Sequence, residues 1–197
     1  EKGQVLEGRA SARGAVYGRV RDKAVAWSAI GEVVDGRARL AHLGEDPVTF
    51  DLPFAGGSEG IHTETARLAW AGVTADVSGA VFSPSDPVLA LHARLQAPRG
   101  EQLTALLPPA AAERISGLAL TDRTTALVDI TGPAESADVE VVLRSTGEAL
   151  VSIGSTGTLR MEGLNVAASI VNLSDPGISA VVTAGGVALD NGSAVET

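Results

Sequence analysis

Several features that would place this chain of 197 residues in a familiar class are missing. It has no cysteine, so neither disulfide bonds nor thiolate metal sites can contribute to its structure. Only 3 % of its residues are aromatic and its net charge is −9, which disfavours stacking on nucleic acid bases and binding to their phosphates. No apolar run approaches the roughly 18 to 20 residues that span a bilayer. The sequence therefore predicts no nucleic acid partner and no transmembrane segment in this chain.

The two ends of the chain carry no processing signal. The sequence begins with Glu1 rather than Met, and no signal peptide pattern follows. Both ends have the alternation of strand edges, so we expect a fragment of a longer protein. The absence of cysteine fits an oxidising envelope compartment, where free thiols are a hazard.

Apolar and polar residues alternate along most of the chain, and Gly, Pro, Asp or Ser interrupts the pattern about every ten residues. The clearest examples are residues 48–54, 138–144 and 164–170, where every second side chain is apolar. Because side chains alternate across a strand, this pattern predicts sheets with one apolar and one polar face. The fold is therefore expected to be mainly β.

The turn residues divide the chain into short strands. Asp35-Gly36 predicts a hairpin turn, because both central residues of such a turn adopt positive φ. The Gly-rich segment 54–60 predicts a flexible break, with an N-terminal β-meander at 1–55 and a second segment at 61–197 that can continue the same sheet. We expect strands at 4–10, 14–20, 24–30, 37–43, 47–52, 61–70, 73–78, 88–95, 118–121, 124–131, 138–144, 149–154, 157–162, 164–173, 178–183 and 186–190.

One stretch has helical rather than strand spacing. Between residues 99 and 117 the apolar residues recur at helical intervals, and Pro108-Pro109 interrupts them. Proline is well placed in a first helical turn and poorly placed inside a helix. We therefore expect one short helical region near 101–116, made of a helix at 101–107 and a second turn or two at 109–116.

No catalytic or metal-binding signature is present. His42, His62 and His92 are scattered and lack the spacing of metal ligands. Residues 154–157 do not have the spacing of a nucleophile elbow, and no Lys-Ser or Lys-Thr follows the glycines of 56–60 as in a phosphate loop. The sequence predicts a protein that is not an enzyme and needs no cofactor or metal. An enzyme on a β scaffold would require groups such as His62 and Glu64 to converge in a pocket.

Two architectures satisfy the alternation. Two sheets can face each other about 10 Å apart in a closed β-sandwich, which buries both apolar faces. Alternatively, one long antiparallel sheet can curl into a partly open groove that the short helix caps. Soluble proteins seldom expose apolar patches beyond a few hundred Å², so an open groove would be a binding surface. The residues alone favour neither architecture.

A family resemblance favours the groove. Residues 87–108 form a strand of alternating Leu and Ala followed by a short helix that ends in Leu107-Pro108, with Gly117 beyond it. This unit resembles a recurring element of the AsmA-like superfamily, which includes the TamB and YhdP proteins. The runs 125–132, 136–145, 148–154 and 165–189 are similar to the strand pairs that follow in those proteins, so the resemblance covers roughly residues 61–190.

The resemblance implies a bacterial envelope protein with a periplasmic β body, in a parent that can be anchored in the inner membrane. In that family a curled sheet forms a hydrophobic groove through which lipids pass between the two membranes. The implied function is to shield lipid acyl chains during intermembrane phospholipid transport or outer-membrane assembly, with other envelope proteins as partners. The alternative is an adhesin-like or appendage β-sandwich that binds a protein or glycan.

The residues expected to line the groove lie on the apolar sides of the best-patterned strands. In a closed sandwich the same residues would simply pack in the core. They are Val128, Ile130, Val139, Val141, Leu143, Leu164, Val166, Ala168 and Ile170.

Overall fold

The computed structural model is mainly β, as the alternation predicts. It describes residues 5–19, 24–39, 46–83, 85–104, 118–152, 157–172 and 177–190, which contain fourteen strands and one single-turn helix. The strands are β1 (Val5–Arg19), β2 (Ala24–Arg39), β3 (Val48–Gly57), β4 (Gly60–Trp70), β5 (Val73–Phe82), β6 (Val88–Ala97), β7 (Leu118–Leu120), β8 (Thr124–Pro133), β9 (Asp138–Ser145), β10 (Glu148–Ser152), β11 (Thr158–Glu162), β12 (Asn165–Val171), β13 (Gly177–Thr183) and β14 (Gly186–Asp190); the helix is α1 (Glu101–Thr104).

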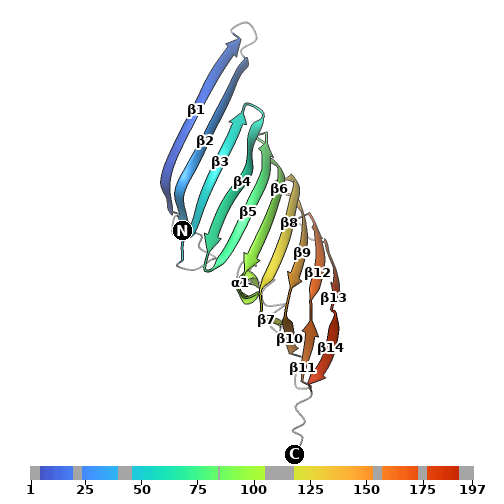
Figure 1. Cartoon of the computed structure of the whole chain (residues 1–197). Coiled ribbons are helices and arrows are strands. Elements are labelled where there is room, and N and C mark those ends of the chain that lie inside the picture. The colour runs from blue at the N-terminus through green and yellow to red at the C-terminus, as the bar shows by residue number, and fades with distance from the viewer. Residues whose placement is uncertain are drawn as a thin grey trace, which may run out of the picture.

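The strands form two antiparallel sheets. The larger has ten strands in the order β1-β2-β3-β4-β5-β6-β8-β9-β12-β13 and is not closed, so β1 and β13 are its edges. The smaller has four strands in the order β14-β11-β10-β7. In Figure 1 the strands lie side by side as one elongated, twisted layer, with the small sheet at the lower end of β8, β9, β12 and β13.

The small sheet continues the last four strands of the large one. Each of its strands is joined to a strand of the large sheet by two or three residues, and these interruptions lie next to one another. Backbone hydrogen bonds link them, from Ser145 N–H to the Leu164 carbonyl (2.9 Å) and from Gly163 N–H to the Gly147 carbonyl (3.2 Å). Gly163 has φ 61°, in the left-handed region that glycine adopts without strain. Four long strands are thus interrupted along one line, which we call the break line.

The predicted hairpin at Asp35-Gly36 is wrong, because β2 runs through it. The pairing of β2 with β3 shifts register between Val33 and Gly36, as in a β-bulge. Asp35 has φ 53°, and its N–H donates to Asp51 Oδ1 at 3.0 Å. A Cβ at Gly36 would lie 2.5 Å from the Phe50 ring. Positive φ followed by glycine suits a bulge as well as a hairpin turn, so the dipeptide marks a bulge here.

The other strands predicted in the N-terminal part are shorter than those in the structure. The strands expected at 4–10 and 14–20 form the single strand β1, and the Gly-rich segment 54–60 is not a flexible break. It contains the end of β3, a turn at Ser58 and Glu59, and the first residue of β4. The division into 1–55 and 61–197 stays a prediction, and β3 and β4 are hydrogen-bonded neighbours across it.

The predictions for the second half fit more closely. Each strand expected between residues 118 and 190 is present, with bounds shifted by at most a few residues. The helix α1 covers Glu101–Thr104, within the helical region expected near 101–116. The rest of that region, from 105 to 116, lies outside the described residues.

Seven of the ten buried apolar residues form two clusters on one face of the sheets. The first joins Val73, Ala97 and Ala126 of the large sheet to Leu103 of α1. The second contains Leu120, Ala149 and Leu164 and lies at the break line. The core is therefore concentrated at the lower end of the sheet, where α1 and the small sheet meet it.

Candidate functional site

One face of the large sheet is apolar across seven strands, from β4 to β13. Strand register places the apolar residues opposite one another in three cross-strand rows, in which Thr63 is the only polar residue. We call these rows the apolar face. The rows are Leu68-Ala75-Leu95-Ala126-Leu143-Val166-Val182, Ala66-Val77-Ala93-Val128-Val141-Ala168-Ala180 and Thr63-Gly79-Leu91-Ile130-Val139-Ile170-Ile178.

The register brings the residues predicted to line a groove together. Val128 and Ala168 both lie opposite Val141, and Ile130 and Ile170 both lie opposite Val139. Leu143 and Val166 are also opposite each other, in the first row. Leu164 lies just before β12 at the break line, packed in the cluster that Leu143 and Val166 adjoin. Whether these residues contact a ligand stays a prediction.

Burial differs strongly between these rows and the lower end of the same side of the sheets. At the lower end, Ala97 and Leu120 are 1 % exposed and Leu164 is 2 % exposed. We call this part, the two core clusters, the sealed end. Farther along, the residues of the second and third rows from β6 to β12 are only half-buried. Among the described elements, extensive contacts join hydrogen-bonded neighbours only, and Figure 1 shows no second layer over these rows. We call them the uncovered stretch.

The apolar face is also hollowed on its N-terminal side. A hollow of about 430 Å³ lies over β2 to β6, next to the uncovered stretch. These lining residues were not among those predicted, although the alternation at 48–54 is the same signal. Apolar residues that line the hollow include Val33, Leu52, Phe54, Ile61, Ala66, Val77, Val81 and Leu91.

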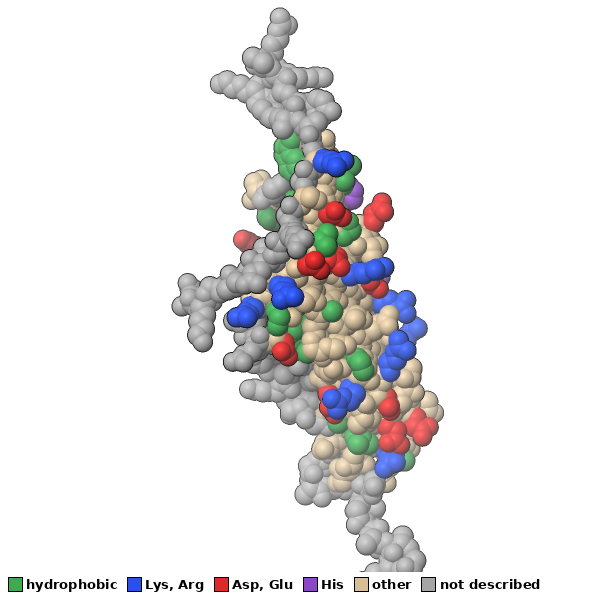
Figure 2. Space-filling model, turned by 60° about the vertical axis from the view of Figure 1, so that its left-hand side comes forward, with side chains coloured by type: hydrophobic (Ala, Val, Ile, Leu, Met, Phe, Trp, Pro, Cys, Tyr) green, Lys and Arg blue, Asp and Glu red, His purple; other side chains and the backbone are tan. Residues whose placement is uncertain are grey.

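The opposite face of the sheet carries charges of both signs, and from β8 to β13 it also holds one apolar row, Leu127-Val142-Ala167-Val181. Register places Arg67 between Asp51 and Asp76, and Arg94 on the other side of Asp76. Opposite charges therefore face each other across β3 to β6, which favours this strand pairing. Figure 2 shows acidic and basic side chains interspersed along one side of the molecule.

The polar face also holds the residues that come nearest to a catalytic arrangement. Ser78, His92 and Asp129 are direct neighbours on β5, β6 and β8. His92 Nδ1 lies 2.6 Å from Asp129 Oδ1, with both side chains about half exposed. Among the described hydrogen bonds, none joins Ser78 to His92. The nucleophile–base contact that catalysis by serine requires is not made in this row.

His62 and Glu64 both border a shallow hollow on β2 to β4, and no ion pair joins them in the described chain. Within the described ranges, no group of three or more His, Asp or Glu residues is placed to hold a metal ion. His42 lies outside those ranges. The histidines that the structure describes are therefore spread over the polar face rather than gathered in one pocket.

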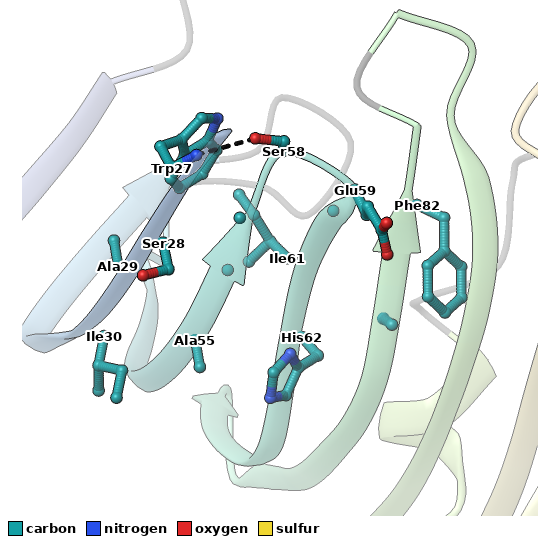
Figure 3. Close-up of a pocket in the computed structure, with 14 residues that line it drawn as sticks. Trp27, Ser28, Ala29, Ile30, Ala55, Ser58, Glu59, Ile61, His62 and Phe82 are labelled. Carbon is teal, nitrogen blue, oxygen red and sulfur yellow. Dashed lines mark hydrogen bonds between the residues drawn. The ribbon is translucent and has the colours of Figure 1, made fainter. Parts of the chain in front are cut away.

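A second hollow, of about 560 Å³, lies at the upper rim beside the β3–β4 turn. In Figure 3, Ile30, Ala55 and His62 point the same way from successive strands, and Phe82 lies beside them. Trp27 is tied to the turn by its backbone N–H, which donates to Ser58 Oγ at 2.9 Å. Ile30 is 70 % exposed, so this rim hollow combines uncovered apolar groups with polar ones.

Comparison with known proteins identifies no relative: no protein family model, no curated protein and no solved structure matches this chain. None of the described helical residues forms a helix long and apolar enough to cross a membrane. A functional assignment therefore depends on the surface geometry and on the resemblance over residues 61–190.

Proposed function

We propose that this chain is part of an AsmA-like protein of the bacterial periplasm, without enzymatic activity. In this proposal the apolar face forms the inner surface of a curled groove that shields lipid acyl chains. The lipid is a phospholipid in transit between the two membranes, or one handled during outer-membrane assembly. The resemblance over residues 61–190 supports the location, and the apolar face supports the ligand.

The observation that carries the proposal is an unbroken apolar face whose second and third rows have no second layer over them in the described chain. Burying apolar surface is worth about 25 cal/mol per Å², so a face of this extent gains free energy from any apolar occupant. Isolated exposed apolar side chains need no explanation, but a contiguous patch indicates a binding surface. Twenty of the twenty-one positions in its three rows are Ala, Val, Ile, Leu or Gly.

The lining suits a flexible chain better than a rigid ligand. The rows offer few polar groups to orient a ligand, and small apolar pockets normally need such groups for specificity. Each CH₂ of an acyl chain gains about 0.8 kcal/mol when it leaves water, without any directional contact. The rows cross the strands, so an acyl chain that lies along them contacts each strand in turn.

The half-buried state of the uncovered stretch supports a curled sheet. Without a second layer, side chains such as Val128 and Val141 can lose solvent contact only to their neighbours on the same face. A concave curl brings those neighbours closer, and twisted sheets curl readily. The hollow of about 430 Å³ lies on this same face, as a groove requires.

Lipid analysis of the purified protein tests the proposal. Organic extraction and mass spectrometry are expected to find stoichiometric phospholipid, and the Val141→Asp/Val166→Asp variant is expected to lose it. Val141→Asp alone is matched by Val142→Asp, because Val142 is the adjacent, half-buried residue that faces the other side of the sheet. The control is expected to keep its lipid. Lipid-free wild-type protein, or equal loss in both single variants, would contradict the groove.

The rim hollow favours a second candidate, a module that binds a protein or glycan. Trp27, Ile30 and Phe82 are exposed there beside Ser58 and Glu59, a mixture of apolar and polar groups common in such sites. This candidate predicts that the protein purifies without lipid. It also predicts that Trp27→Ala and Phe82→Ala abolish binding in a glycan array or pull-down, whereas Val141→Asp leaves binding unchanged.

A further inference from the structure

We propose that two copies of this chain join at the edge formed by β13 and β14, which pairs with the same edge of the second copy. The two sheets then form one continuous antiparallel layer. This inference concerns assembly and does not depend on lipid binding.

The edge is unpaired and apolar on both faces. In the described chain β13 is hydrogen-bonded only to β12, and β14 only to β11. The large apolar side chains of this edge are between 57 % and 65 % exposed. On the next strand inward, Val166, Ala168 and Ile170 are half-buried. A further strand beside β13 would bury the edge residues to the same extent as those of β12. The exposed residues are Ile178, Val181, Val182, Val187 and Leu189.

The edge formed by β13 and β14 lacks the features that normally prevent a sheet edge from pairing with another chain. Natural edge strands carry charges, prolines or bulges that prevent pairing with another chain. Residues 177–189 contain no charged residue, no histidine and no proline, and Asp190 at the end of β14 is the one charge on this edge. The opposite edge, β1, contains Glu7, Arg9 and Arg13, and its pairing with β2 is irregular between Glu7 and Arg9. The β1 edge therefore has features that disfavour pairing with another chain, and the β13 edge does not.

A second copy fits this edge better than a charged partner does. The chain has a net charge of −9, so two copies repel each other over most of their surface. The neutral strip at 177–189 lets them meet without placing like charges opposite each other.

A two-fold axis perpendicular to the sheet makes the two edges antiparallel, as all the described strand pairs are. It also keeps both apolar faces on the same side, so the rows that end at Ile178, Ala180 and Val182 continue into the second copy. Pairing β13 with β1 of another copy would be head-to-tail and would grow without closing. The charges of β1 and its irregular pairing with β2 disfavour that arrangement.

Molar mass in solution, measured by light scattering in dilute and concentrated samples, tests the proposal. The wild-type chain is expected to have twice the mass of one chain in concentrated samples. Val181→Lys and Val182→Lys, which place a charge on opposite sides of β13, are each expected to halve it. Val171→Lys is the control, because Val171 is 56 % exposed but lies on the interior strand β12. It is expected to leave the dimer intact.

Hydrogen exchange separates edge pairing from other modes of association and does not depend on the variants folding. In wild-type protein, amides of β13 and β14 are expected to gain protection as concentration rises, while those of β1 do not. A single-chain mass at every concentration would overturn the proposal. So would larger assemblies in which β1 is also protected, or a dimer that both folded Lys variants preserve.

Discussion

The sealed end and the uncovered stretch lie on the same side of the sheets but differ in what lies over them. Both consist mainly of aliphatic residues at alternate positions of antiparallel strands, joined at the sealed end by Leu103 of α1 and Leu164 at the break line. Leu120 and Leu164 at the sealed end are almost fully buried, whereas Val128 and Val141 in the uncovered stretch are half-buried. Alternation thus specifies which side of a strand is apolar, and the elements around it decide whether that side becomes core or surface.

Two structural features bury the residues of the sealed end. The first is α1, which places Leu103 against the sheet and is anchored by Gln102 Nε2, a donor to the Ala71 carbonyl at 2.7 Å. The second is the break line, where Leu120, Ala149 and Leu164 pack together. Neither feature reaches the uncovered stretch. The following substitutions test this difference, from the largest expected effect to the smallest.

Truncation at the sealed end should cost the most stability. Leu164→Ala and Leu120→Ala are each expected to lower the free energy of unfolding by about 2 to 5 kcal/mol, because each leaves a cavity in a closed cluster. Leu189→Ala makes the same change at a side chain that is 59 % exposed, and should cost less than about 0.5 kcal/mol. Urea denaturation measures all three. Equal losses would mean that Leu120 and Leu164 are no better buried than an exposed residue at the sheet edge.

Truncating Leu103 of α1 should expose more of the first core cluster to solvent. Leu103→Ala is expected to cost about 2 kcal/mol, at the lower end of the range, because a single-turn helix can relax into the space. Hydrogen exchange should then quicken in β5, β6 and β8, whose residues Val73, Ala97 and Ala126 pack against Leu103. Unchanged exchange in these strands would show that α1 does not protect them from solvent.

Several side-chain hydrogen bonds cross the break line, and one of them can be removed alone. Asp122 Oδ2 accepts the backbone N–H of Glu148 at 3.0 Å, which joins the start of β10 to the segment between β7 and β8. Asp122→Ala is expected to cost about 1 kcal/mol in thermal or urea unfolding. Asp122→Asn keeps an acceptor oxygen and should recover much of the loss. If both variants matched wild type, the bond would not contribute to the break.

The polar face of the small sheet should contribute least. Arg160 Nη1 lies 3.1 Å from Glu148 Oε1, with the side chains 48 % and 41 % exposed. Because solvent screens such a pair, Arg160→Met is expected to change stability by less than about 1 kcal/mol. Urea unfolding checks this. A loss as large as that of Leu164→Ala would mean that the polar face, rather than the apolar clusters, stabilises this end.

Strand positions could be predicted where local pattern alone decides them. In β6 every second residue from Leu89 is apolar and Pro87 precedes the strand, so the strand was evident from the sequence. Asp35-Gly36 was misread because positive φ suits both a hairpin turn and a bulge, and only the pairing of β2 with Asp51 and Phe50 on β3 distinguishes them.

The candidate site could be predicted only in part. Val128, Val141 and Ala168 belong to neighbouring strands close in sequence, so their shared face followed from alternation and short turns. The hollow could not be predicted, because it joins Val33, Phe54 and Leu91 from distant parts of the chain. Cover by α1 also depends on tertiary packing, which no local pattern encodes.

The central claim is that the uncovered stretch admits an acyl chain while the sealed end does not. The chain has no cysteine, so single-cysteine variants can be labelled with a maleimide without background. In delipidated protein, Val141→Cys should react quickly and Leu120→Cys slowly. Lysophospholipid should slow the reaction of Val141→Cys and leave that of Val142→Cys, on the opposite face, unchanged. If Val141→Cys reacted as slowly as Leu120→Cys in delipidated protein, or at the same rate with and without lipid, the account would be contradicted.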